Sequence, residues 1–213
     1  MYDYVINCGR VNEDSLVGAS IKEIINWAVD KIMRKERALV IMGESGSGKT
    51  TALLAIMNRL RKLGIPVAYV NSYNELGLKS IKLVDCHNDS NARVFLVDDI
   101  DAAFAVPKIA QGFVNKVLGG FNGTIVATLT VPLLVSNDLE MLEPLIMLLR
   151  SASRVAIEYR DDELRAFAQR IGIDYVRPIM RTPPGMVLRN FRRLSGNNDS
   201  ALSRVLNDGN VVL

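Results

Sequence analysis

Short apolar runs and longer segments of helical period alternate along most of this chain. The apolar runs lie at residues 38–42, 67–71, 94–97, 123–130 and 155–159. Segments in which apolar residues recur at helical spacing lie at residues 20–34, 51–63, 102–118, 136–150 and 161–171. Runs of this length are typical of buried strands, and strands that alternate with helices form parallel sheets. The pattern therefore predicts an α/β fold with three layers, αβα, around a central parallel sheet.

Particular residues locate the ends of several elements. Ser20 is in position to cap the first helix, and Gly64 with Pro66 ends the second. Pro107 predicts a break or kink in the third helix, because proline has no amide to donate at an interior helical position. Residues 72–92 are polar and irregular, which predicts a short helix or strand between loops.

The two ends of the chain do not share this alternation. Residues 1–16 show no clear period and are expected to form an N-terminal arm. The P-loop core described below is expected to span residues 17–172. Residues 173–213 are expected to form a small, shortened C-terminal helical lid and a tail.

The composition is that of an ordinary globular protein, with 49% hydrophobic residues, 23% charged residues and a net charge of +3. No apolar run reaches the ~18 residues of a membrane span and no signal peptide opens the chain, so we expect a cytoplasmic protein with no membrane partner. Cys8 and Cys86 form neither a metal-binding spacing nor a disulfide framework, which favours a reducing compartment. The pair Cys86 and His87 is interpreted as a core thiol beside a loop imidazole.

The stretch GESGSGKT, from Gly43 to Thr50, matches the P-loop pattern G-x-x-x-x-G-K-[ST] between a predicted strand and a predicted helix. Its glycines allow backbone N–H groups to point into one concavity that holds phosphate oxygens, and the helix start adds its own unpaired N–H groups. Lys49 is expected to reach the β- and γ-phosphates of ATP, and the Thr50 hydroxyl to ligate Mg²⁺. The residues expected to bind the nucleotide here are Gly43, Glu44, Ser45, Gly46, Ser47, Gly48, Lys49, Thr50 and Thr51.

Two acids follow the apolar run VFLV. Asp98 and Asp99 come directly after it, as expected of a central parallel strand that delivers carboxylates to the edge where the P-loop lies. Asp98 is expected to hold Mg²⁺ through water, and Asp99 to polarise the attacking water. Asp101 is open to two interpretations, a helix cap or a third catalytic acid.

Thr128 and Thr130 share one face of the next predicted strand, GTIVATLT. A polar side chain at the carboxyl end of this strand could contact the γ-phosphate or the attacking water, and Thr128 is the candidate for this catalytic role. The preference of threonine for strands explains its presence equally well.

The order of these features resembles that of the AAA+ ATPases, and within them the clamp-loader and replication-initiator branches. The likeness spans about residues 15–194 and follows the P-loop, the acidic strand, the polar-tipped strand, a fifth strand and a helical tail. It implies Mg²⁺-dependent ATP hydrolysis, assembly into a homo-oligomer, and action on nucleic acid or on a replication or recombination protein. By the same likeness, Thr128 falls near the sensor 1 position.

The resemblance also gives roles to arginines. Ser153-Arg154-Val looks like the Ser-Arg-Cys box of clamp loaders, so Arg154 is the candidate arginine finger toward a neighbouring subunit's nucleotide, with Arg150 as a substitute. An arginine that caps a helix C-terminus is the alternative. Arg189, in a segment that resembles sensor 2, is the candidate contact to the bound phosphates. Contact with DNA and a solvated helix face are the alternatives for Arg189.

Two departures from the family pattern keep other functions open. Asp99 stands where many members have the longer glutamate, and the lid is short. The leading function is an ATPase that assembles into a ring or filament. The others are a nucleotide-switched binding module with little turnover and a P-loop small-molecule kinase.

Overall fold

The computed structural model describes residues 4–11, 13, 16, 18–119, 121–130 and 142–170. Within this part, the central sheet has five parallel strands in the order β3-β5-β6-β2-β7. The strands are β2 (Ala38–Gly43), β3 (Val67–Asn71), β5 (Val94–Asp98), β6 (Thr124–Thr130) and β7 (Ser153–Ala156). The first four coincide with predicted apolar runs, whereas β7 overlaps its predicted range, 155–159, only at residues 155 and 156.

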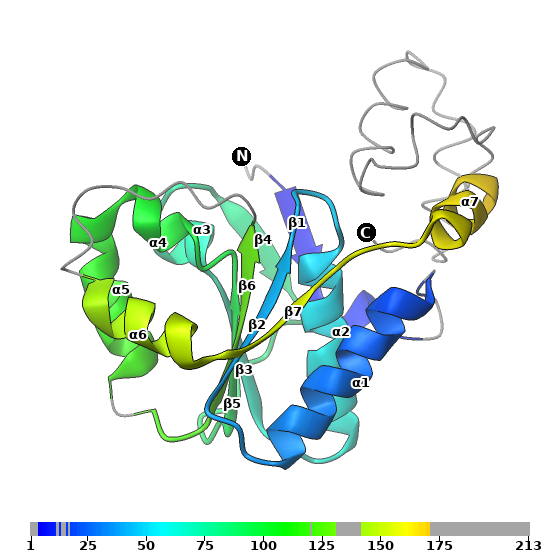
Figure 1. Cartoon of the computed structure of the whole chain (residues 1–213). Coiled ribbons are helices and arrows are strands. Elements are labelled where there is room, and N and C mark those ends of the chain that lie inside the picture. The colour runs from blue at the N-terminus through cyan, green and yellow to red at the C-terminus, as the bar shows by residue number, and fades with distance from the viewer. Residues whose placement is uncertain are drawn as a thin grey trace.

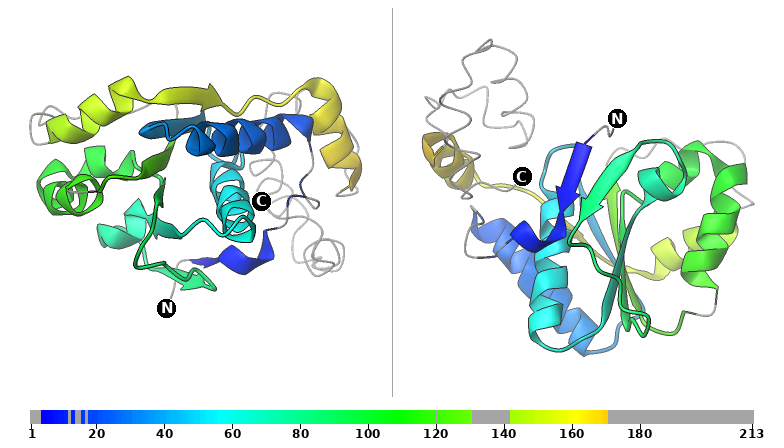
Figure 2. Two further views of the ribbon diagram at one scale, coloured as in Figure 1. Left: turned by 90° about the horizontal axis from the view of Figure 1, so that it is seen from below. Right: turned by 180° about the vertical axis from the view of Figure 1, so that it is seen from behind.

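Helices cover both faces of this sheet (Figures 1 and 2). On one face lie α1 (Ala19–Met33) and α2 (Lys49–Lys62), and on the other α4 (Ala102–Ala105), α5 (Pro107–Leu118) and α6 (Glu143–Ser151). Strand alternation assigns the side chains of β6, since Val126 packs with the α1 and α2 side whereas Ile125 and Ala127 pack with the other. The predicted three-layer αβα fold is confirmed.

The helix predicted after the acidic strand is broken where proline requires it. The chain leaves α4 at Val106 and begins α5 at Pro107, which takes the first helical position, where its missing amide costs nothing. The irregular region after β3 contains both a helix, α3 (Ser72–Glu75), and a strand, β4 (Ile81–Val84).

The N-terminal arm is more ordered than expected. Strand β1 (Tyr4–Asn7) pairs in parallel with β4 as a separate two-stranded sheet, and a 3-10 turn, η1 (Cys8–Arg10), follows it. A four-residue strand is too short to show a period in the sequence, which is why the pattern missed it.

The prediction that the two cysteines stay unpaired is wrong. Cys8 and Cys86 form a disulfide with their Cα atoms 5.1 Å apart, across 78 positions of sequence. The pairing of β1 with β4 brings the two cysteines together. Because the expectation of a reducing compartment rested on unpaired cysteines, the disulfide removes the basis for it. Among the residues that the structure describes, no helix is long and apolar enough to cross a bilayer.

Helix α7 (Asp161–Arg170) begins where predicted, with acids in its first turn. It lies beside the start of α1 (Figures 1 and 2). The predicted cap of α1 by Ser20 is wrong, because Gly18 takes the cap position and Ser20 lies inside the helix. The predicted lid and tail, residues 173–213, lie outside the described residues.

Candidate functional site

The P-loop connects the carboxyl end of β2 to the start of α2. Gly43 is the last residue of β2, and a Cβ there would lie 2.4 Å from the Ser47 Oγ. Gly46 and Gly48 adopt φ angles of 82° and 91°, a left-handed conformation that favours glycine. Each of the three glycines is therefore required by the observed loop, and Lys49 follows as the first residue of α2.

The lysine and two hydroxyls of this loop suit an anionic ligand. The Lys49 ammonium donates to the carbonyl oxygens of Gly43 (3.0 Å) and Glu44 (2.9 Å), folded back over its own loop. Burial lowers the pKa of Lys49, although the nearby aspartates oppose the shift. Among the described residues, the buried hydroxyls of Ser47 and Thr51 have no hydrogen-bond partner. Such orphaned donors are expected where a ligand completes the site.

Asp98 ends β5 and is fully buried. Its Oδ1 accepts from the Thr128 hydroxyl (2.6 Å), and its Oδ2 accepts from the Tyr69 hydroxyl (3.1 Å) and the Asn71 amide (3.4 Å). Donors from the neighbouring strands β3 and β6 thus hold both carboxylate oxygens in place.

Asp99 follows in a left-handed conformation, with φ 53°. Its backbone N–H donates to the Thr128 Oγ1 (2.7 Å), and its Oδ2 accepts from the Asn71 amide (3.3 Å). Burial, together with the charges of Asp98 and Asp101, raises the pKa of Asp99 to about 7. A carboxyl group with this pKa can accept a proton near neutral pH, as a general base must.

Asp101 and Thr130 form the outer part of the same edge. Asp101 occupies the cap position of α4, but its side chain does not cap the helix and instead accepts from the Thr130 N–H (3.3 Å). Of the two interpretations of Asp101, the helix cap fits its position at the start of α4, but its side chain makes no capping hydrogen bond.

Two site residues escaped the sequence analysis. Tyr69 and Asn71 lie on β3, and both donate to Asp98. Asn71 could have been found, because it ends an apolar strand just as Asp98 does. Tyr69 gave no such signal.

Arg154 lies on β7, opposite Val40 in the middle of β2, and is exposed. Its guanidinium donates to the carbonyl oxygens of Leu149 (2.8 Å) and Arg150 (3.3 Å) at the C-terminus of α6. Within one chain it is a helix cap, the alternative left open by the sequence, and the structure does not bring it to its own P-loop. Arg189 lies outside the described residues.

The oxygen donors at this edge fit Mg²⁺. Among the described residues, no group of three or more histidine, cysteine, aspartate or glutamate side chains is arranged to hold a metal ion. Magnesium in phosphate-binding sites needs no such group, because it takes one or two protein oxygens, the phosphates and several waters. The Thr50 hydroxyl and the Asp98 carboxylate would supply these two protein oxygens.

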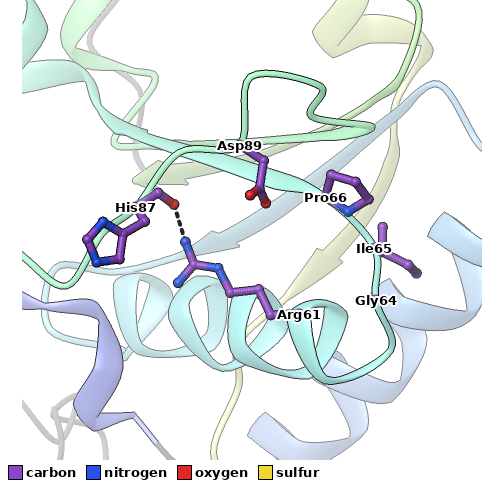
Figure 3. Close-up of a pocket in the computed structure, with 6 residues that line it drawn as sticks. All are labelled: Arg61, Gly64, Ile65, Pro66, His87 and Asp89. Carbon is purple, nitrogen blue, oxygen red and sulfur yellow. Dashed lines mark hydrogen bonds between the residues drawn. The ribbon is translucent and has the colours of Figure 1, made fainter.

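A pocket of about 400 Å³ lies at the opposite end of α2 from the P-loop (Figure 3). It is lined by Arg61, Gly64, Ile65, Pro66, His87 and Asp89. The Arg61 guanidinium donates to the His87 carbonyl oxygen, and the Asp89 carboxylate accepts from the Val67 N–H (2.8 Å). These charged groups therefore hold the segment before β5 in place, and we do not assign the functional site there.

One family model matches part of this chain. The family model described as novel STAND NTPase 3 matches residues 23–110, a range that includes the P-loop, Asp98 and Asp99. No curated protein matches the sequence.

Several solved structures share the fold. The chain is similar to AMPPCP-bound DnaA from Aquifex aeolicus, with a TM-score of 0.55, 14% identity, and coverage of 91% of this chain and 67% of that one. It is similar to a DNA replication initiation factor, with a TM-score of 0.54, 16% identity, and coverage of 84% and 61%. It is also similar to replication initiator DnaA bound to AMPPCP and single-stranded DNA, with a TM-score of 0.53, 13% identity, and coverage of 88% and 64%.

The chain spans about two thirds or less of the length of these initiators. Identities this low establish the fold alone. The resemblance stated from the motifs is confirmed at that level: the chain has the fold of an AAA+-type P-loop NTPase, as found in the replication initiators.

Proposed function

We propose that the chain binds ATP with Mg²⁺ at the P-loop and hydrolyses it. The observation that carries the proposal is that the P-loop and the acids at the carboxyl end of β5 lie at one edge of the sheet, where Gly43 pairs with Thr130 of β6 and Asp98 accepts from Thr128 of the same strand. The charges of Asp98, Asp99 and Asp101 raise the pKa of Lys49 against the lowering effect of burial. The charge of Lys49 in turn lowers the pKa of Asp99. The cation that would bind phosphate and the acid that would act on water therefore lie near one another at this edge of the sheet.

The residues of the site divide into three roles. The loop amides and Lys49 would hold the phosphates, with Lys49 exchanging its two carbonyl partners for phosphate oxygens. Thr50 and Asp98 would hold Mg²⁺, which supplies charge neutralisation at the phosphates. Asp99, deprotonated, would take the proton of the attacking water.

Thr128 supports these acids rather than contacting the ligand. Its hydroxyl bonds both Asp98 and the backbone of Asp99, and its side chain is fully buried. We therefore assign it the role of a positioning residue.

A nucleotide-switched binding module is the second candidate. The fully buried Asp98 is held by three donors, and Asp99 is tied to Asn71. If these contacts persist when ATP binds, Asp99 stays away from the water and turnover is slow.

We further propose that the chain works as a homo-oligomer on nucleic acid or on a nucleic-acid-processing complex. The support is the fold shared with an initiator that binds single-stranded DNA. In such an assembly Arg154, exposed on an edge strand, would reach a neighbour's nucleotide.

The test of the first proposal compares wild type with Lys49→Ala and Asp99→Asn. We expect Lys49→Ala to lose nucleotide binding, and Asp99→Asn to bind ATP but to hydrolyse it at least about 100-fold more slowly. Lys116→Ala is the matched control, because Lys116 is exposed on α5 and pairs with Glu75 of α3. Binding without turnover in wild type would favour the switch, and wild-type ATP affinity in Lys49→Ala would refute the proposed site.

The oligomer is tested by mixing two inactive variants. Lys49→Ala subunits lack a working P-loop, and Arg154→Ala subunits lack the finger. If Arg154 acts across an interface, the mixture should regain part of the ATPase activity, whereas no gain at saturating ATP argues against a role in trans. Single-stranded DNA added at low salt should raise turnover or assembly if nucleic acid is the partner.

A further inference from the structure

The segment that joins β7 to α7 passes beside the P-loop and contacts it. The Ile157 N–H donates to the Met42 carbonyl oxygen (2.8 Å), which extends the pairing of β7 up to the start of the loop. The Tyr159 hydroxyl then donates to the Ser47 carbonyl oxygen (2.8 Å). A Cβ placed on Gly48 would lie 3.1 Å from that hydroxyl, so the tyrosine packs closely on the loop.

This hydrogen bond acts on a peptide unit that the phosphate site needs. The Ser47 carbonyl and the Gly48 N–H belong to the same peptide, and in a trans peptide the two groups point in opposite directions. When Tyr159 holds the carbonyl on its own side, it directs the Gly48 N–H away from itself. Without this bond the peptide could rotate more easily, because Gly48 has no Cβ to limit its backbone conformation.

The other end of the segment is fixed by Glu163. Its carboxylate is buried and accepts from the Ser20 N–H (2.6 Å), the Ser20 hydroxyl (2.6 Å) and the Arg160 N–H (2.8 Å). The starts of α1 and α7 are thereby tied together beside Tyr159. Burial and the Glu163 charge raise the pKa of Tyr159 to about 12, which keeps the hydroxyl protonated as a donor.

We propose that Tyr159 is a positioning residue for phosphate binding, which orients the peptide between Ser47 and Gly48 from outside the P-loop motif. The inference rests on the proposed function, since it assumes that the loop binds a nucleotide. It predicts that the hydroxyl contributes to the affinity for any ligand that carries a di- or triphosphate, and that its contribution is independent of the base.

The test is Tyr159→Phe, which keeps the ring and removes only the hydroxyl. Affinities for ATP, ADP and inorganic tripolyphosphate are measured by competition against a fluorescent nucleotide, with thermal unfolding recorded on the same samples. We expect all three affinities to weaken by about three- to tenfold, the size of one hydrogen bond. At saturating ATP, kcat should stay within about twofold, because the bound phosphate then holds the loop.

Ser151→Ala is the matched control, since it removes a hydroxyl that donates to a backbone carbonyl, that of Leu148 (3.0 Å), on α6 away from the P-loop. It should leave all three affinities unchanged. Unchanged affinities in Tyr159→Phe overturn the inference, even if that variant melts earlier, because the hydroxyl would then serve stability alone. A loss for ATP without a loss for tripolyphosphate also overturns it. Wild-type protein that binds none of the three ligands refutes the proposed function, and the inference falls with it.

Discussion

Replacing Glu163 with alanine measures how strongly one buried carboxylate holds two helix starts together. The residue is 5% exposed, and its carboxylate accepts three hydrogen bonds, two from Ser20 and one from Arg160. Each hydrogen bond to a charged group stabilises a fold by about 1.5–3 kcal/mol. Both amides lie at helix starts, where water replaces part of what is lost, so each of the three bonds is expected to contribute only about 1 kcal/mol. We expect Glu163→Ala to reduce the free energy of unfolding by about 3 kcal/mol.

The assay is urea denaturation at neutral pH, with Glu163→Gln and Glu158→Ala measured beside it. The glutamine keeps an acceptor but loses the charge, so we expect a loss of about 1–2 kcal/mol. Glu158 is an exposed glutamate of the same segment, and its replacement should change stability by less than about 0.5 kcal/mol. If Glu163→Ala is no less stable than Glu158→Ala, the reasoning from buried hydrogen bonds is refuted.

The effect should depend on pH in one direction. Burial raises the pKa of Glu163, but the hydrogen bonds from Ser20 and Arg160 outweigh it, so the pKa lies below its ordinary value. A lowered carboxyl pKa gives stability that is present above the ordinary pKa of about 4.3 and is lost as the pH falls through the pKa of the folded state. The difference in stability between wild type and Glu163→Gln should therefore narrow below about pH 4.

The remaining predictions concern the acids and the disulfide. If Asp99 is the general base, the ATPase rate should rise with pH around a midpoint near 7, as the carboxylate forms, and this rise should be absent in Asp99→Asn. Because the hydrogen bond from Asn71 lowers the pKa of Asp99, Asn71→Ala should move the midpoint to higher pH, whereas Asn58→Ala, whose amide bonds the N-terminal segment, should leave it in place. Cys8→Ser should lower the free energy of unfolding by about 3 kcal/mol under oxidising conditions, and excess dithiothreitol should remove most of the difference from wild type; equal stabilities without reductant would contradict a stabilising disulfide.

The sheet and the P-loop could be predicted because their signals are local. A strand buried on both faces, such as β5, must be apolar throughout, and the glycines at 43, 46 and 48 are each required by the loop's own backbone. The missed features depend on residues far apart in sequence. Ser20 is bonded by Glu163, 143 positions away, and Cys8 by Cys86, 78 positions away, so neither partner can be found from a window of neighbouring residues.

Thr128 and Thr130 share one face of β6, as predicted, but alternation along a strand does not predict how deeply each side chain is buried. The Thr128 hydroxyl has one proton, which it donates to Asp98, and it accepts from the Asp99 N–H, so no donor remains for a phosphate. Thr130 lies on the same face two residues nearer the edge, level with Gly43 of the P-loop, and is only partly buried. If a threonine of this strand contacts the γ-phosphate, Thr130 is therefore the better candidate. Thr128→Val should then remove the hydrogen bonds that hold Asp98 and Asp99 in place. Thr130→Val should leave those bonds intact and change only the binding and hydrolysis of ATP.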